Sequence, residues 1–196
     1  MRNMRRARKA DYSSYVGWGW KEPNCHLYLA FLGEYFERCR FIYVMRHGLD
    51  MAYSDNTSQM RNWGPALGVV VPAEEALRPK AALKFWVTAS RRAISLGQEM
   101  GPDKFLLLSF DQLCASPRPE TERLIDFLGL DRRELDIDYL ASIPKTPASA
   151  SRYREHDLGV LEPEDVDAVR ELGFVVEAQQ CCVYERSGGT SSTSLV

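Results

Sequence analysis

The 196-residue sequence lacks several features that would place it in a particular class of protein. It has no run of about 18 apolar residues, so we expect no membrane-spanning helix. Its charges almost cancel, because 25 Lys and Arg residues stand against 27 Asp and Glu residues and the formal net charge is −2. This balance gives no reason to expect nucleic acid as a partner. The Arg-rich start over residues 2–9 is followed by no apolar stretch or cleavage-like site, and we interpret it as a solvated helix face rather than a targeting peptide.

The spacing of cysteine and histidine matches neither a zinc site nor a disulfide framework. The five cysteines are an odd number, and only Cys181 and Cys182 are close in sequence. The histidines His26, His47 and His156 are dispersed. We therefore expect reduced thiols, no metal cofactor and a cytoplasmic protein.

Strand-like and helical patterns alternate along the chain, which is typical of an α/β protein with a mostly parallel sheet. We expect one domain over residues 1–186, followed by a disordered Ser/Thr/Gly-rich tail at 187–196. Apolar runs predict strands at 41–44 and 104–109, with a third around 16–20. Apolar spacing predicts helices over 26–37, 51–60, 79–100, 119–128 and 162–172.

The segment FIYVMRHGLDMAYS, residues 41–54, combines a buried strand with residues suited to an anion. Arg46 stands at the carboxyl end of the strand, where ligands of parallel sheets bind, and its guanidinium can fork onto phosphate oxygens. We expect Gly48 to allow a sharp turn, Asp50 to charge the first helical turn, and Ser54 to offer its hydroxyl from the second turn. The alternative is an Arg46 that only forms a salt bridge with a neighbour.

Five segments in series resemble the sulfotransferase family: WGWKEP (18–23), FIYVMRHGLDMAYS (41–54), FLLLSFDQL (105–113), PETERLIDFLGL (119–130) and SASRYREHDLGVL (149–161). The resemblance implies a parallel sheet like that of the P-loop NTPases, flanked by helices. It also implies 3′-phosphoadenosine 5′-phosphosulfate (PAPS) as the sulfuryl donor and co-substrate. By the same resemblance, Arg46 and Ser54 bind the 3′-phosphate, and Ser151 and Arg152 lie near it with Ser149 as a further candidate.

The sequence departs from the family pattern in two places. The usual Arg-Asp-Pro opening of the second nucleotide motif appears as Arg46-His47-Gly48. Residues 1–17 show no strand followed by the Gly/Ser/Thr-rich loop that cradles the 5′-phosphosulfate in the family. The resemblance therefore indicates a domain that is truncated and incomplete at its N-terminal strand. An apolar sheet edge without that strand would pair with other chains, so we expect marginal stability or self-association.

Sulfuryl transfer requires a deprotonated acceptor, neutralised charge on the sulfonate and a stabilised phosphate leaving group. The Lys21-Glu22-Pro23 segment resembles the family motif near the acceptor, which makes Glu22 and Lys21 the first catalytic candidates. His47 is a third candidate, and His26 an alternative that instead begins a helix. A second set of residues either lines an acceptor pocket or forms a polar helix face that ends in a packed tryptophan: Asn56, Gln59, Arg61 and Trp63.

The sequence thus favours a sulfotransferase that moves a sulfuryl group from PAPS to a hydroxyl or amine on a small-molecule, lipid or carbohydrate acceptor. The alternative is a catalytically inactive remnant that binds adenosine 3′,5′-bisphosphate or a partner protein. A kinase-like nucleotide enzyme is disfavoured, because no GxxxxGK[ST] motif occurs in the chain.

Overall fold

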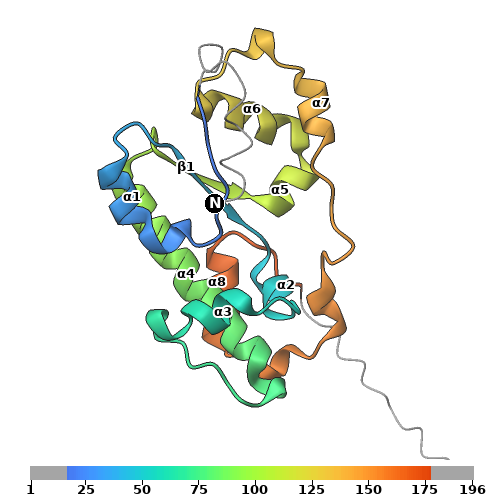
Figure 1. The fold of residues 1–196 in the computed structure, drawn as a ribbon. Helices are drawn as coiled ribbons and strands as arrows, with labels where there is room; N and C mark the ends of the chain where they lie inside the picture. Colours follow the sequence, from blue (N-terminus) through green and yellow to red (C-terminus); the bar gives the residue numbers. More distant parts are fainter. Residues whose placement is uncertain (1–16, 178–196) are drawn as a thin grey trace, which may run out of the picture.

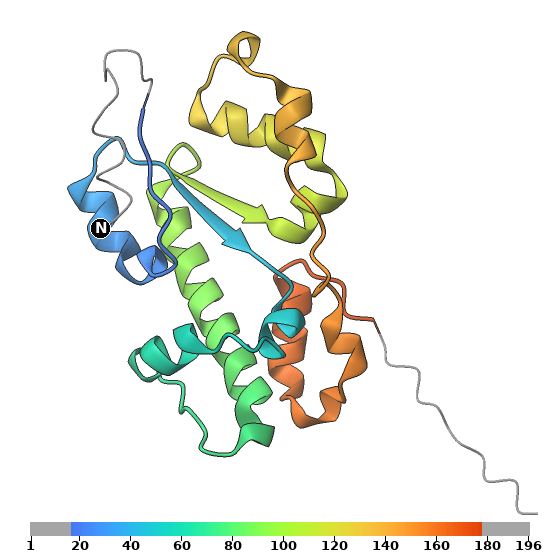
Figure 2. The ribbon, with the colours of Figure 1, turned by 45° about the vertical axis from the view of Figure 1, so that its right-hand side comes forward.

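The computed structural model describes residues 17–177, and the predictions for the Arg-rich start, the Cys181-Cys182 pair and the tail lie outside them. Two parallel strands form a small sheet flanked by helices, as Figures 1 and 2 show. Strand β1 spans Phe41–Met45 and β2 spans Phe105–Ser109, with Phe41 opposite Phe105 and Met45 opposite Ser109. The predicted α/β class and both predicted strands are confirmed.

The predicted third strand around 16–20 is wrong for its described part, because residues 17–20 have no regular structure. The side chains of Trp18 and Trp20 stack on each other with ring centres 5.4 Å apart, and both also contact the ring of Phe36. The aromatic side chains of this segment therefore form a cluster with one another instead of a strand ladder.

Helices account for most of the regular structure. The α-helices are α1 (Leu29–Tyr35), α2 (Gly48–Ala52), α3 (Ser58–Trp63), α4 (Arg78–Met100), α5 (Phe110–Ala115), α6 (Pro117–Leu128), α7 (Ile137–Ser142) and α8 (Pro163–Glu171). Short 3₁₀ turns are η3 (Cys25–Tyr28), η4 (Pro65–Leu67), η5 (Glu75–Leu77), η6 (Arg132–Glu134), η7 (Arg152–Glu155) and η8 (Leu158–Val160). The predictions of α4, α6 and α8 are confirmed within two residues at either end.

Helix α4 is the long central element, and the sheet, α2 and α8 all pack against it (Figures 1 and 2). It meets the sheet closely at two points. The Tyr43 hydroxyl lies 3.4 Å from Ser90 Oγ, and a Cβ at Gly97 would come within 2.4 Å of the Phe105 ring. Small residues on this side of α4 therefore set its distance from the sheet.

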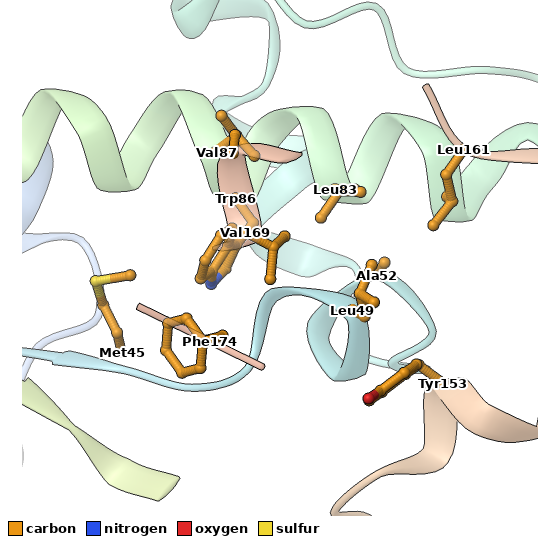
Figure 3. Packing of buried hydrophobic residues seen from close by; sticks show 11 residues of the cluster. Met45, Leu49, Ala52, Leu83, Trp86, Val87, Tyr153, Leu161, Val169 and Phe174 are labelled. Carbon is orange, nitrogen blue, oxygen red and sulfur yellow. The ribbon is translucent and has the colours of Figure 1, made fainter. Parts of the chain in front are cut away.

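The main hydrophobic core lies beyond the carboxyl end of β1, where α2, α4 and α8 meet (Figure 3). Leu49 and Leu83 are fully buried there, which corresponds to about 1.5–3 kcal/mol of transfer free energy for each side chain. Phe85 and Trp86 are both buried. Trp86 belongs to this core, and Phe85 belongs to a second cluster with Met60.

The helix predicted over 51–60 is wrong in its middle, because α2 ends at Ala52 and α3 begins at Ser58. Polar side chains between the two helices bond to the backbone instead. Ser54 Oγ accepts from the Asn56 N–H at 3.3 Å, and Asn56 Oδ1 accepts from the Ser58 N–H at 3.2 Å. Such local bonds compete with helical ones, which accounts for the break.

One side of the sheet remains open. Strand β1 has β2 as its only strand neighbour within residues 17–177, and Val44 is 52% exposed beside the partly exposed Ile42. The exposed side chains belong to a strand with a single strand neighbour in this part of the chain, and self-association stays a prediction. In this same part of the chain, no helix is both long and apolar enough to cross a membrane.

Candidate functional site

Arg46 follows β1 directly and is the centre of a polar cluster. Its Nη2 lies 3.4 Å from Ser149 Oγ, which comes from a segment 103 residues further along the chain. Its guanidinium carbon lies 5.7 Å from the centre of the Phe110 ring. Its Nε is buried and has no hydrogen-bond partner among the described residues. An arginine with a desolvated, unused donor is suited to an incoming anion.

Asp50 holds the second segment of this cluster in place. Its side chain is 3% exposed, and its two carboxylate oxygens accept from the backbone N–H groups of Ser151 at 2.8 Å and Tyr153 at 3.3 Å. The sequence suggested that Asp50 charges the first turn of a helix. The structure shows in addition that it ties α2 to residues 151–153. We call Arg46, Asp50, Ser149 and Arg152 the Arg46 cluster.

Arg152 enters the cluster from the start of η7. Its Nε donates to Ser149 O at 3.2 Å and its Nη1 donates to Tyr53 O at 3.3 Å. Its Nη2 has no hydrogen-bond partner within the described residues. Neither Arg46 nor Arg152 forms an ion pair there, whereas most other arginines do, such as Arg91 with Glu171. Within the described residues neither guanidinium is paired directly with a carboxylate, and the one acidic member of the cluster, Asp50, bonds to backbone N–H groups.

A cavity of about 550 Å³ lies against this cluster. Its lining includes Ser149, Arg152 and Arg78, together with Tyr53 and His156, whose rings stack face to face with centres 4.1 Å apart. The cavity is thus bordered by guanidinium groups and by flat rings, and the carboxylates of Asp55 and Glu155 line it as well. The guanidinium groups and the rings suit a ligand that carries phosphate and a planar ring.

The other two predicted phosphate ligands are placed differently. Ser54 lies in the loop after α2, not in the second helical turn as expected, because its hydroxyl is used in the local turn with Asn56. Ser151 has φ 63° and is the only non-glycine residue with positive φ in the described part of the chain. This left-handed backbone turns the Ser151 N–H onto Asp50. Backbone geometry therefore explains the position of Ser151.

His47 is fixed by its surroundings. Its Nδ1 accepts from the Leu49 N–H at 3.2 Å, which caps α2, and this leaves Nε2 to donate to Val175 O at 3.0 Å. Its ring stacks on Tyr153 with centres 4.8 Å apart. Its backbone N–H donates to Asp111 Oδ2 at 2.9 Å. Both ring nitrogens are occupied, so the histidine that replaces the usual Asp of the motif positions the loop beside Arg46.

Gly48 serves a different purpose from the one expected. It has no positive φ and is buried within α2. A Cβ at this position would come within 2.7 Å of the Trp86 ring and 2.9 Å of Val169. The glycine is therefore needed for close packing of α2 on the core, and not for a sharp turn.

Lys21 and Glu22 are not part of the Arg46 cluster. Glu22 lies before η3 and lines a second pocket of about 450 Å³, together with Asn24, Tyr28, Phe31 and Trp63. We call this the aromatic pocket. Glu22 and Trp63, which the sequence singled out separately for the acceptor side, both line it, and their role in binding an acceptor stays a prediction. Of the other predicted acceptor residues, Asn56, Gln59 and Arg61 do not line it.

His26 lies in η3 beside the sheet, with its ring centre 6.1 Å from that of Tyr43. Burial lowers the pKa of His26 below its ordinary value of 6.5, and the positive charge of Arg92 lowers it further. Arg92 donates to the carbonyl groups of His26 and Leu27 at 2.9 and 3.2 Å. The neutral imidazole is therefore favoured in the folded protein.

The connections after the two strands are short. Helix α2 begins at Gly48, three residues after the end of β1, and α5 begins at Phe110 directly after β2. Within residues 17–177, neither strand is followed by a glycine-rich phosphate loop. The described residues thus offer side-chain donors for an anion, and no backbone cradle of that kind.

The fold and the site define an α/β protein with an arginine-containing polar cluster at the end of a parallel strand. A model of the sulfotransferase family matches residues 2–134, which is more than half of the chain. The chain therefore belongs to the sulfotransferase family. Comparison with curated proteins gives no significant match, and comparison with solved structures gives none either. Ser149 and Arg152 lie beyond the matched residues, so their place beside Arg46 is an independent finding of the structure.

Two features of the site were missed from the sequence. Asp50 was noted only for its charge near a helix start, and nothing in its local pattern indicated a bond to residues 151–153. The stacked pair Tyr53 and His156 was not singled out, because 103 residues separate the two rings in sequence. The burial of Asp50, which only the structure shows, is the observation that points to its role.

Proposed function

We propose that the chain binds PAPS with its 3′-phosphate at the Arg46 cluster, on a P-loop-like fold, and acts as a sulfotransferase on a hydroxyl or amine acceptor. One observation carries the proposal. Arg46 Nη2 contacts Ser149 Oγ, and the buried Nε of the same guanidinium has no hydrogen-bond partner among the described residues. Charge-assisted bonds to phosphate are stronger than neutral ones and would use this donor.

The residues of the cluster have distinct roles in this proposal. Arg46 and Arg152 hold the phosphate by charge, and the Ser149 hydroxyl adds a neutral hydrogen bond. Ser54 and Ser151 are assigned as further ligands of the same group on the family resemblance. Asp50 and His47 position the two segments. The cavity beside Arg152 would take the nucleoside, with the Tyr53–His156 stack as an apolar wall.

On the acceptor side, we assign the proton-accepting role to Glu22. Its Oε1 accepts from the Asn24 side chain at 2.9 Å, which orients the carboxylate and leaves Oε2 for a ligand. Lys21 is its neighbour in sequence and would neutralise charge on the transferring group. Bound PAPS would supply the sulfuryl group itself. The proposed roles of Glu22 and Lys21 rest on the family resemblance of residues 18–23 and on the shared pocket with Trp63.

Calorimetry with adenosine 3′,5′-bisphosphate tests the nucleotide part of the proposal. We expect measurable binding, and we expect adenosine 5′-monophosphate, which lacks the 3′-phosphate, to bind at least about tenfold more weakly. Arg46→Ala should weaken bisphosphate binding by about 2–4 kcal/mol, since it removes one or two charge-assisted contacts.

The matched control is Arg133→Ala, which removes an exposed arginine paired with Asp131 and should leave the affinity unchanged. Absence of heat at millimolar bisphosphate, or an Arg46→Ala variant with undiminished affinity, would mean that the site has been misassigned. Arg46→Lys adds a further check, because a point charge keeps the attraction but loses the fork geometry.

One observation favours a second function, an inactive binder of adenosine 3′,5′-bisphosphate or of a partner protein. In the described residues neither strand leads into a glycine-rich loop that would hold a 5′-phosphosulfate. A sulfuryl-transfer assay with PAPS and a mixture of alcohols and amines separates the two functions. Transfer to any acceptor excludes the inactive binder, and bisphosphate binding without transfer favours it.

A further inference from the structure

Two side chains of the aromatic pocket, Asn24 and Glu22, have acceptor oxygens with unused hydrogen-bonding capacity. Asn24 Oδ1 is buried and has no hydrogen-bond partner among the described residues. The orientation of this amide is fixed, because its Nδ2 donates to Glu22 Oε1 at 2.9 Å. The second carboxylate oxygen of Glu22 has no partner in the same part of the chain. A ligand that satisfies these atoms must therefore bring N–H or O–H donors.

The negative charge of Glu22 has no counter-ion within residues 17–177, since none of the ion pairs formed there includes it. Lys21, which precedes Glu22 in sequence, and Arg61, two residues before Trp63, do not line the pocket. Arg92 packs close by, but its guanidinium donates to the carbonyl groups of His26 and Leu27. The pocket thus presents a carboxylate without a bound cation.

The remaining wall of the pocket is aromatic and apolar. The rings of Tyr28 and Trp63 stand perpendicular to each other at 88°, with centres 6.2 Å apart. Phe31 is 60% exposed and Tyr28 is 50% exposed, so the rings are open to a ligand. Aromatic faces carry partial negative charge and attract cations, most strongly when solvent is displaced.

From these three features we propose that the aromatic pocket binds the ammonium group of a primary or secondary amine that has an apolar body. The N–H groups donate to Asn24 Oδ1 and Glu22, and the cation faces the rings of Tyr28 and Trp63. An alcohol of the same shape brings one donor and no charge. If the proposed function holds, this ligand is the acceptor, and the family member is selective for an amine over an alcohol.

Binding of 2-phenylethylamine and of its neutral analogue 2-phenylethanol, measured without nucleotide near neutral pH, tests this inference. The amine is protonated there, as an alkylammonium group with a pKa near that of lysine. The indole N–H signal of Trp63, identified by its loss in Trp63→Phe, reports occupancy by NMR. We expect the amine to bind at least about tenfold more tightly than the alcohol.

Glu22→Gln should reduce this preference to about threefold or less, because it removes the charge and keeps the shape. Tyr28→Leu should weaken the amine about three- to thirtyfold through loss of a ring face, and it should affect the alcohol less. The matched control is Glu34→Gln, an exposed carboxylate on α1 that does not line the pocket and should change neither affinity.

Equal affinity for the two probes, tighter binding of the alcohol, or an unmoved Trp63 signal with both probes at millimolar concentration overturns the inference. Its failure is distinct from that of the nucleotide site. If 2-phenylethylamine binds and adenosine 3′,5′-bisphosphate does not, the proposed function fails and the amine site stands. The reverse result retains the nucleotide site and removes the amine site.

Discussion

The Arg46 cluster and the aromatic pocket are built in opposite ways. The Arg46 cluster joins segments about 100 residues apart, and the buried carboxylate of Asp50 links them. The aromatic pocket comes mostly from residues 22–32, with Trp63 as its distant member. The first is basic and hydrogen-bonded, and the second is acidic and lined by exposed rings.

This difference determines how each region responds to mutation. A site that depends on long-range hydrogen bonds is lost when a single linking residue is removed, because the segments are held together by few contacts. A site formed by neighbouring residues on a surface loses affinity in smaller steps, since each ring or acceptor contributes separately. The variants below are ordered by the size of the effect that we expect on the folded protein.

Asp50→Ala should have the largest effect, a loss of about 2–4 kcal/mol in the free energy of unfolding. It leaves the backbone N–H groups of Ser151 and Tyr153 without their acceptor in a buried place. Chemical denaturation measures the loss, and calorimetry should show weaker bisphosphate binding by the variant. Asp138→Ala, at an exposed carboxylate on α7, is the control and should change stability little. A loss below about 1 kcal/mol at Asp50 would show that the two segments are held together in another way.

Gly48→Ala tests the packing beneath the Arg46 cluster and should cost about 1–3 kcal/mol. The new methyl group would meet the Trp86 ring at 2.7 Å, and α2 would have to move away from α4. The gain in helix propensity, about 1 kcal/mol, offsets only part of this cost. Thermal and denaturant unfolding measure the result. Gly19→Ala is the control, because a Cβ there meets nothing within 4 Å. Equal stability of the two variants would contradict the tight contact.

Asp50 and Gly48 show which parts of the structure could be predicted from the sequence and which could not. The α/β class, the two strands, α4 and the place of Arg46 followed from apolar periodicity and from the chemistry of a strand end. The roles of Asp50 and Gly48 did not, because each depends on a partner more than 30 residues away in sequence. The break after Ala52 was missed for a local reason, since Ser54 and Asn56 bond to their own backbone. In the aromatic pocket, Glu22 and Trp63 were singled out separately, and only the fold brings them together.

The third variant, His26→Gln, concerns η3, the turn that carries the pocket residue Tyr28, and should have the smallest effect, confined to acidic pH. Burial and Arg92 lower the pKa of His26 in the folded state below 6.5, so the unfolded chain takes up the proton first as the pH falls. The stabilisation by the neutral ring is therefore complete above pH 6.5 and is lost as the pH falls from 6.5 through the lower pKa of the folded state. Glutamine does not titrate, so the free energy of unfolding of the variant should fall less steeply between pH 8 and pH 5 than that of the wild type.

Denaturation curves at several pH values measure both slopes, with pH 8 as the reference at which the histidine is neutral in both states. Parallel curves for the two proteins would mean that His26 is as free to take up a proton in the fold as in the unfolded chain. A shallower slope for the variant would instead show that the fold keeps the His26 ring of η3 neutral, through desolvation and the nearby charge of Arg92.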